Sequence, residues 1–405
     1  MDSVKIGKYL AELRKSYKVT QDELALRLGV SRQAVSRWET GSSVPDVELL
    51  LKISELYGIT IDAILHTDIS TLRIRERNPL VDNKLNPKKI FVIGCGRWGT
   101  FLAWYLDKIG HKVSLYGREN SVNMQRLQTY HKNDYLILPE SVRLTTILEE
   151  GAEADYFVIS VSSQSLHAVT TQLKQLEIKE KLIVLCMKGL EIHSGRRLSQ
   201  IADDTLDHSN RVAVWLGPGH VQDFIKGIPN CMVIDSNSEF VKDELISSFS
   251  SDLIRFYYGT DLIGNEIGAA AKNVIGIAAG MLDGLECSTL KGALMARGSK
   301  EVGRLIGAMG GKEHSAYGLC HLGDYEATLF SKHSQNRCYG EAIVIGKGYD
   351  KLAEGAHTVK ALRNLGKNYG IELPICEAVY RILYNNKQPR LILERLFSRS
   401  LKSEF

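Results

Sequence analysis

Lys272 is the side chain in this sequence best suited to proton transfer. It lies beside Asn273 in the middle of segment 264–280, which otherwise holds mostly small and apolar residues. Alanines favour a helix there, and the small side chains allow close packing. Burial in such a helix would lower the pKa of the lysine towards a value useful for acid–base chemistry. The alternative is an ammonium group that extends to water along its apolar stem, and the residues alone leave both open.

Segment 94–99 has the glycine spacing of a dinucleotide-binding turn. The apolar run 90–93 precedes it, a helical stripe follows as far as Gly110, and segment 112–116 is typical of a second strand. In that setting the glycines allow a tight turn and close approach of a pyrophosphate to a helix N-terminus. We therefore expect a bound NAD or NADP, with contacts from Gly94, Gly96, Arg97, Trp98 and Gly99.

The end of the second strand bears on the choice between the two cofactors. It is followed by Gly117, Arg118 and Glu119. An arginine at this place can bind a 2′-phosphate, whereas an acidic residue can hold a ribose 2′-hydroxyl. Arg118 therefore favours NADP slightly, while Glu119 keeps NAD open and Arg118 can equally be an exposed surface residue.

The elements that must position these groups form an α/β sheet followed by helices. Apolar runs at 156–161, 182–186 and 212–216 are separated by helical patterns, which predicts a doubly wound, mostly parallel sheet. Polar residues just after such strands, among them Ser163, Lys188 and His220, line one sheet edge, where ligands bind. After about residue 257 helical patterns dominate. We expect an NAD(P)-binding Rossmann domain at 89–257 and an all-α substrate and catalytic domain at 258–405.

Residues 1–68 predict an all-α helix-turn-helix head. Thr20 and Glu23 form a capping box, Gly29 can end that helix, and Ser31 can cap the next one. The second helix, about 32–40, would turn its apolar side chains inwards and its polar side chains towards DNA. Residues 1–70 hold nine Lys or Arg against ten Asp or Glu, so a head that docks protein instead stays open. The residues of this helix expected to face outwards to DNA are Arg32, Gln33, Ser36 and Arg37.

The remaining composition sets broad limits. The 405 residues carry a net charge of +4, and the seven cysteines are scattered without a C-x-x-C pair, so we expect neither a disulfide framework nor a metal site. No segment has the length and hydropathy of a membrane span or the pattern of a signal peptide, so we expect a cytoplasmic protein. Segment 69–88, with six basic and two acidic residues at 70–89, is expected to be a linker.

Two resemblances sharpen these expectations. The blocks at 20–25 and 29–41 closely resemble the Cro/repressor type of helix-turn-helix domain. This resemblance implies that Gln21 and Ser31 contact DNA phosphate and that Arg32, Gln33, Ser36 and Arg37 contact DNA. From about 89 to 390, the turn at 94–99 and the blocks at 188–191, 217–218, 271–275, 322–324, 334–340 and 354–355 resemble the NAD(P)-dependent glycerol-3-phosphate dehydrogenase family.

The second resemblance implies hydride transfer between NAD(P)H and dihydroxyacetone phosphate, or the reverse reaction from sn-glycerol 3-phosphate. It implies that Lys272 exchanges the proton of the C2 oxygen, that Lys188 lies near both substrate and cofactor, and that Glu354 contacts the cofactor. The other substrate-binding residues that it implies are Gly217, Asp324, Ser334, Gln335 and Asn336.

Two departures from that family concern the substrate. The family usually has Ser and Phe after Gly-Pro, where this chain has Gly219 and His220, and usually has Arg where this chain has Gln335. A glutamine cannot supply the charge of a bidentate phosphate contact. Arg337 or His220 can compensate only if the fold brings one of them to the substrate.

Two functions follow from these observations. The first is a glycerol-3-phosphate dehydrogenase with a sequence-specific DNA-binding head. The alternative is a transcription regulator whose dehydrogenase-like body senses NAD(P)H or a phosphorylated metabolite with little or no turnover. A homodimer is expected in either case, because helix-turn-helix heads usually read paired half-sites.

Overall fold

The chain divides into two compact units, Met1–Lys84 and Leu85–Phe405, each described here by itself. The structure is a computed structural model that describes residues 2–16, 19–57, 61–67 and 86–398. Most of the linker expected at 69–88 therefore lies outside the described residues. Among the described residues, no helix has both the length and the apolar character needed to cross a bilayer.

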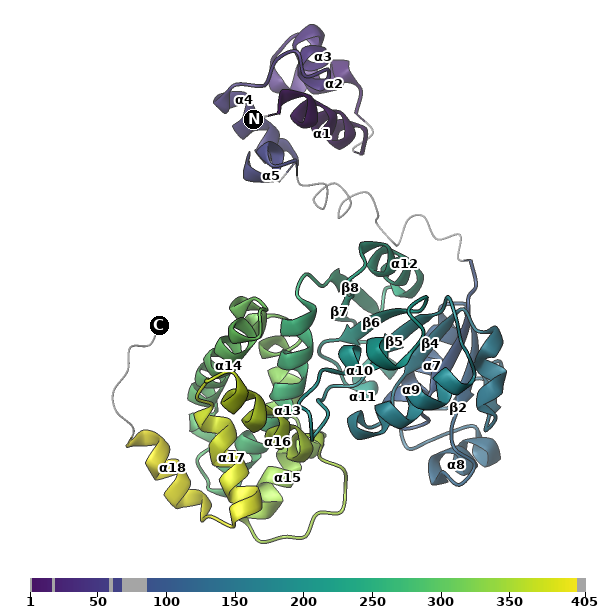
Figure 1. The fold of residues 1–405 in the computed structure, drawn as a ribbon, viewed down its shortest axis with the longest axis vertical. Helices are drawn as coiled ribbons and strands as arrows, with labels where there is room; N and C mark the ends of the chain where they lie inside the picture. The colour runs from purple at the N-terminus through teal and green to yellow at the C-terminus, as the bar shows by residue number, and fades with distance from the viewer. Residues whose placement is uncertain (1, 17–18, 58–60, 68–85, 399–405) are drawn as a thin grey trace. The chain divides into compact units, whose positions relative to one another are not determined.

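The first unit is a bundle of short helices around one apolar core (Figure 1). Thr20 and Glu23 form the expected capping box, and Gly29 ends its helix in the left-handed conformation, with φ +71°. The Ser31 side chain accepts a hydrogen bond from the Ala34 N–H and so caps the next helix. The local signals thus set the helix-turn-helix geometry as expected. The helices are α1 (Ser3–Ser16), α2 (Gln21–Leu28), α3 (Arg32–Glu39), α4 (Val47–Tyr57) and α5 (Ile61–Leu65).

The second unit begins with an eight-stranded sheet in the order β3-β2-β1-β4-β5-β6-β7-β8. All neighbouring strands run parallel except β6 and β7. The sheet is therefore mostly parallel, as expected, although three strands at 143–145, 230–235 and 254–258 were not foreseen. The strands are β1 (Lys89–Ile93), β2 (Lys112–Tyr116), β3 (Arg143–Thr145), β4 (Tyr156–Ile159), β5 (Leu182–Leu185), β6 (Arg211–Leu216), β7 (Asn230–Asp235) and β8 (Ile254–Tyr258).

Helices cover both faces of this sheet. Alternate residues of β1 point to opposite faces, so Ile90 and Val92 join one apolar core while Phe91 and Ile93 join the other. The first core takes in α7 (Arg97–Lys108), α8 (Val122–Tyr130) and α12 (Glu239–Phe249). The second takes in α9 (Leu166–Gln175) and α10 (Leu198–Thr205). This is the doubly wound arrangement that the sequence predicts.

The rest of the unit is helical and is built around α13 (Leu262–Gly284), which is buried over most of its length. A Cβ atom at Gly280 would lie 1.9 Å from the Arg337 carbonyl oxygen, so only glycine permits this close crossing with α15. The other helices are α11 (Val221–Ile225), α14 (Lys291–Ala308), α15 (Gln335–Val344), α16 (Glu354–Asn368), α17 (Pro374–Asn385) and α18 (Pro389–Phe397). Short 3₁₀ turns lie at 148–153, 163–165, 288–290, 313–317 and 322–324, and a π-helical turn at 326–330.

Candidate active site

The glycine turn joins the end of β1 to the start of α7. Gly94 has φ +112°, and a Cβ atom at Gly99 would lie 1.8 Å from the Gly94 carbonyl oxygen. Only glycine fits at these two places. A Cβ atom at Gly96 would meet no atom within 4 Å, so this residue faces open space at the N-terminus of α7. The turn therefore leaves room for a pyrophosphate beside free backbone N–H groups, and it fits a dinucleotide.

A pocket of about 290 Å³ adjoins this turn and lies between the sheet and the helical part of the unit. Arg97 and Trp98 line it at the cofactor turn, and Trp98 also packs on Phe101 with ring centroids 5.0 Å apart. Most residues expected from the sequence to bind substrate or cofactor meet here. The lining includes Lys188, Lys272, Asp324, Ser334, Gln335, Asn336 and Glu354.

Two lysines share one carboxylate in this pocket. Asp324 Oδ2 lies 2.5 Å from Lys272 Nζ and 2.7 Å from Lys188 Nζ. Lys188 also donates to the Gly217 carbonyl oxygen at 2.5 Å, which places Gly217 at the cluster. Lys272 donates to the Thr328 hydroxyl at 2.9 Å, a partner that no sequence pattern indicated. The second oxygen of Asp324 is buried and has no hydrogen-bond partner in the part of the chain that the structure describes.

Lys272 is held in the interior and does not extend to water. Its relative exposure is 7%, and burial is the largest cause that lowers its pKa from 10.5 to about 7. The neighbouring Lys188 also lowers the pKa of Lys272, while Asp324 raises it. A lysine with this pKa can both give and accept a proton near neutral pH.

Hydrogen bonds of amide and carboxylate side chains fix the positions of further residues that line the pocket. Asn273 donates to the Lys188 carbonyl oxygen at 2.7 Å, and Asn336 donates to the Asn273 side chain at 3.0 Å. Glu354 accepts a hydrogen bond from Ser163 at 3.1 Å, and burial raises the pKa of Glu354. Asn336 and Glu354 therefore belong to the pocket wall, and so does Ser163, one of the polar residues expected after the strands at this edge.

Two other predicted site residues are Ser334, which has a second contact outside the pocket, and Arg118, which does not line the pocket. Ser334 lines the pocket and also caps α15 by accepting a hydrogen bond from the Arg337 N–H at 3.3 Å. Arg118 is exposed beyond β2, beside the exposed Glu119 and outside the pocket lining. Arg118 and Glu119 are therefore both exposed at the end of β2, as the sequence-based choice between NADP and NAD requires.

In the first unit, the residues expected to contact DNA lie on or beside α3. Arg32, Gln33 and Arg37 are exposed, and Ser36 is half-buried. Gln21 donates to Glu39 at 2.8 Å, and the same carboxylate pairs with Arg14 at 2.6 Å. Gln21 therefore also links α2 to the ion pair between Glu39 and Arg14.

Comparisons with known proteins agree with this geometry. Residues 89–241 match the family model described as NAD-dependent glycerol-3-phosphate dehydrogenase N-terminus, and residues 261–394 match the model of its C-terminus. Residues 10–64 match the helix-turn-helix family model. A glycerol-3-phosphate dehydrogenase (NAD(P)+) of Clostridium botulinum is 35% identical over 329 residues, which is 78% of this chain and 99% of that protein.

This chain belongs to the NAD(P)-dependent glycerol-3-phosphate dehydrogenase family. Another relative, glycerol-3-phosphate dehydrogenase (NAD(P)+) 1 of Salinibacter ruber, is 36% identical over 78% of this chain and 96% of its own length. The crystal structure of glycerol-3-phosphate dehydrogenase from Coxiella burnetii aligns with a TM-score of 0.72 and 30% identity, over 77% of this chain and 99% of that one. The chain is therefore an oxidoreductase that uses NAD or NADP and acts on a small molecule.

Position 335 holds glutamine where the family usually has arginine. Gln335 lines the pocket in its place and accepts a hydrogen bond from the Tyr349 hydroxyl at 2.6 Å. At Gly219, φ is +147° and a Cβ atom would lie 2.4 Å from the Phe224 ring, which explains why the family's serine does not fit this loop. His220 follows Gly219 and lines the pocket.

Proposed function

We propose that the second unit interconverts dihydroxyacetone phosphate and sn-glycerol 3-phosphate, with Lys272 as the general acid and base. The observation that carries this proposal is a buried lysine whose pKa is lowered to about 7, in a pocket that adjoins a dinucleotide turn. The nicotinamide supplies or accepts the hydride at C2 when the cofactor is bound.

In the reduction, Lys272 donates its proton to the C2 oxygen as that oxygen gains negative charge. In the oxidation, neutral Lys272 removes the proton of the C2 hydroxyl. Asp324 contacts Lys272 and Lys188 at once, so it fixes both ammonium groups beside the reacting oxygen. Lys188 then stabilises the developing charge on that oxygen by a charge-assisted hydrogen bond.

The remaining roles follow from position. The turn at 94–99 with Arg97 and Trp98 holds the pyrophosphate side of the cofactor, and Glu354 contacts the cofactor across the pocket. Gly217, Ser334, Gln335 and Asn336 hold the substrate. Arg118 gives a slight preference for NADP, because it is exposed beyond β2 where a 2′-phosphate would lie.

The decisive assay follows NAD(P)H oxidation with dihydroxyacetone phosphate in the full chain and in Lys272→Met. We expect turnover in the natural chain and none in the variant, with cofactor affinity unchanged because Lys272 acts at C2. The alternative function, a sensor, requires tight NAD(P)H binding without turnover in either protein, together with DNA affinity that depends on the cofactor.

We also propose that the first unit binds DNA sequence-specifically through α3. Support comes from the helix-turn-helix match and from the exposed Arg32, Gln33 and Arg37, whose side chains suit guanine, adenine and phosphate. A homodimer would present two such helices to paired half-sites.

A salt-dependent gel shift with the full chain tests this second proposal. Arg37→Ala should weaken binding markedly, whereas Lys52→Ala should not, because Lys52 is exposed on α4 and pairs there with Glu48. Absence of binding to any DNA at low salt would leave the alternative that the head docks protein.

A further inference from the structure

His220 lines the substrate pocket and carries a buried polar atom that no hydrogen bond within the described part of the chain uses. It is the residue before α11 and lines the pocket with Lys272 and Gln335. Its Nε2 atom is buried and has no hydrogen-bond partner among the described residues. A buried imidazole nitrogen without a partner costs free energy unless a ligand or water satisfies it.

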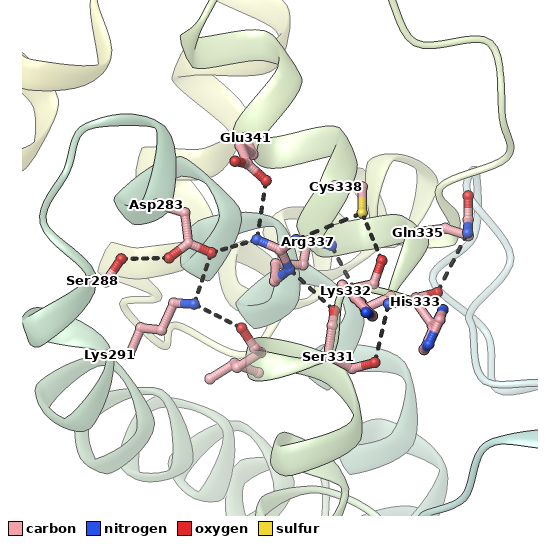
Figure 2. A network of polar contacts seen from close by, with 12 residues as sticks. Asp283, Ser288, Lys291, Ser331, Lys332, His333, Gln335, Arg337, Cys338 and Glu341 are labelled. Carbon is pink, nitrogen blue, oxygen red and sulfur yellow. Dashed lines mark hydrogen bonds and ion pairs between the residues drawn. The ribbon is translucent and has the colours of Figure 1, made fainter. Parts of the chain in front are cut away.

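Arg337, the nearest arginine in sequence to Gln335, is committed elsewhere. Its guanidinium donates to Asp283 at 2.7 Å, to Glu341 at 3.0 Å and to the Ser331 carbonyl oxygen at 3.1 Å. Figure 2 shows Arg337 turned towards Asp283 and Glu341, with Gln335 apart from this cluster. Residues two apart on a helix do not share a face, so a cation at 337 cannot act for one at 335.

A second imidazole lies close to His220. The ring centroids of His220 and His333 are 6.2 Å apart and the planes are inclined by 76°. His333 is exposed beside the pocket, directly before Ser334, and Gln335 donates to its carbonyl oxygen at 3.4 Å. With N–H···O distances of about 2.8 Å, two imidazoles at this separation can both donate to one tetrahedral anion.

The charges around His220 are mixed. Arg97 of α7 and Lys272 of α13 are cationic neighbours, while Asp324 and Asp223 are anionic ones. Burial lowers the pKa of His220, and the two cations lower it further. The neutral ring still offers an N–H donor in one tautomer, and a bound phosphate would favour its protonated form.

We propose that His220, assisted by His333, binds the phosphate end of the substrate in place of the absent arginine. The inference rests on the proposed dehydrogenase function and names the group that holds the end of the substrate remote from C2. It makes His220 a substrate-binding residue and leaves proton transfer to Lys272.

The test compares His220→Phe with His220→Gln, since a glutamine amide can place a donor near the position of Nε2. In His220→Phe we expect the KM for dihydroxyacetone phosphate to rise about tenfold or more, the loss expected for a hydrogen bond to a charged group. We expect kcat and the KM for NAD(P)H to change little, and His220→Gln to recover much of the loss. The matched control is His208→Phe. His208 is an exposed histidine that precedes the start of β6, whereas His220 follows the end of the same strand.

A second variant restores a positive charge at position 335. Gln335→Arg should lower the KM for dihydroxyacetone phosphate, and in the double variant with His220→Phe it should remove most of the penalty. An unchanged KM in His220→Phe overturns the proposal. So does equal damage from Phe and Gln, which would mean a packing role, or a fall in kcat alone, which would mean a role at C2.

Direct binding separates this proposal from the proposed function. Calorimetric titration of sn-glycerol 3-phosphate into the NAD(P)+-loaded chain needs no turnover. If the natural chain binds it without turnover and His220→Phe weakens binding, the phosphate subsite stands although the dehydrogenase proposal fails. If the natural chain binds no sn-glycerol 3-phosphate, the phosphate subsite is refuted as well.

Discussion

Asp324→Asn isolates the electrostatic role of the carboxylate between the two lysines. The change keeps the shape of the side chain but removes a negative charge 2.5 Å from Lys272 Nζ. An adjacent opposite charge typically shifts a pKa by 1–3 units. Taking about 2 units, or about 2.7 kcal/mol, the pKa of Lys272 should fall from about 7 to about 5.

The sign of the effect follows from the direction of the reaction. Reduction needs protonated Lys272, so kcat/KM is level below the pKa of this lysine and falls about tenfold per pH unit above it. In the natural chain the profile should bend near pH 7. In Asp324→Asn it should already fall across the whole range from about pH 6 to 8, because the protonated fraction at pH 7 drops from about one half to about one in a hundred.

The assay is the pH dependence of kcat/KM for dihydroxyacetone phosphate at saturating NAD(P)H. Asp283→Asn is the matched control, because Asp283 is a carboxylate that pairs with Lys291 and Arg337 outside the pocket. Both variants should lose stability, but only Asp324→Asn should move the bend. A bend that stays near pH 7 in Asp324→Asn, with melting and cofactor binding showing a folded protein, would refute the electrostatic account.

Three further predictions concern cofactor binding at the glycine turn, the cofactor preference set by Arg118, and the stability of the head. Gly96→Ala should weaken NAD(P)H binding at least tenfold in a fluorescence titration, because the added Cβ enters the open space that the pyrophosphate would occupy, and it should leave the melting temperature unchanged. Gly99→Ala should lower the melting temperature as well, because its Cβ would lie 1.8 Å from a backbone oxygen. Arg118→Ala should raise the KM for NADPH several-fold and leave that for NADH nearly unchanged; equal effects on both would refute a role at the 2′-phosphate. Glu39→Gln should destabilise the head by about 2 kcal/mol in denaturant titrations, since it removes the negative charge that pairs with the half-buried Arg14; a loss under about 0.5 kcal/mol would show that water replaces the carboxylate.

The elements that could be predicted from the sequence are those with local signals. The capping box at Thr20, the left-handed Gly29 and the glycine turn each depend on residues close in the chain, and all three are confirmed. Strands β7 and β8 were missed although both contain apolar residues. β8 alternates buried and exposed residues, so it lacks the uniform apolar run of a central parallel strand, whereas β7 holds such a run at 231–234 that the sequence reasoning overlooked.

The candidate site was predictable only in part. Lys188, Lys272 and Asp324 come from three distant segments, and only resemblance to a family brought them together before the structure did. Ser163 follows a predicted strand and so was expected at the ligand-binding edge, although not as a partner of Glu354. Thr328 carries a hydroxyl without any such signal, so nothing in the sequence marked it as a partner of Lys272. The sequence left open whether Lys272 is buried or extends to water, because helical periodicity alone does not fix how deeply a helix is packed. The exposure of 7% in the structure decides for burial.

The position of Arg337 shows why a charge count along the chain cannot replace the fold. In sequence it lies two residues after Gln335, which suggests a simple exchange of one cation for another. On α15 those two positions face different ways, and Asp283 and Glu341 hold the guanidinium outside the pocket lining. A donor that acts for the absent arginine must therefore come from another segment, and His220 meets that requirement from the loop that follows β6.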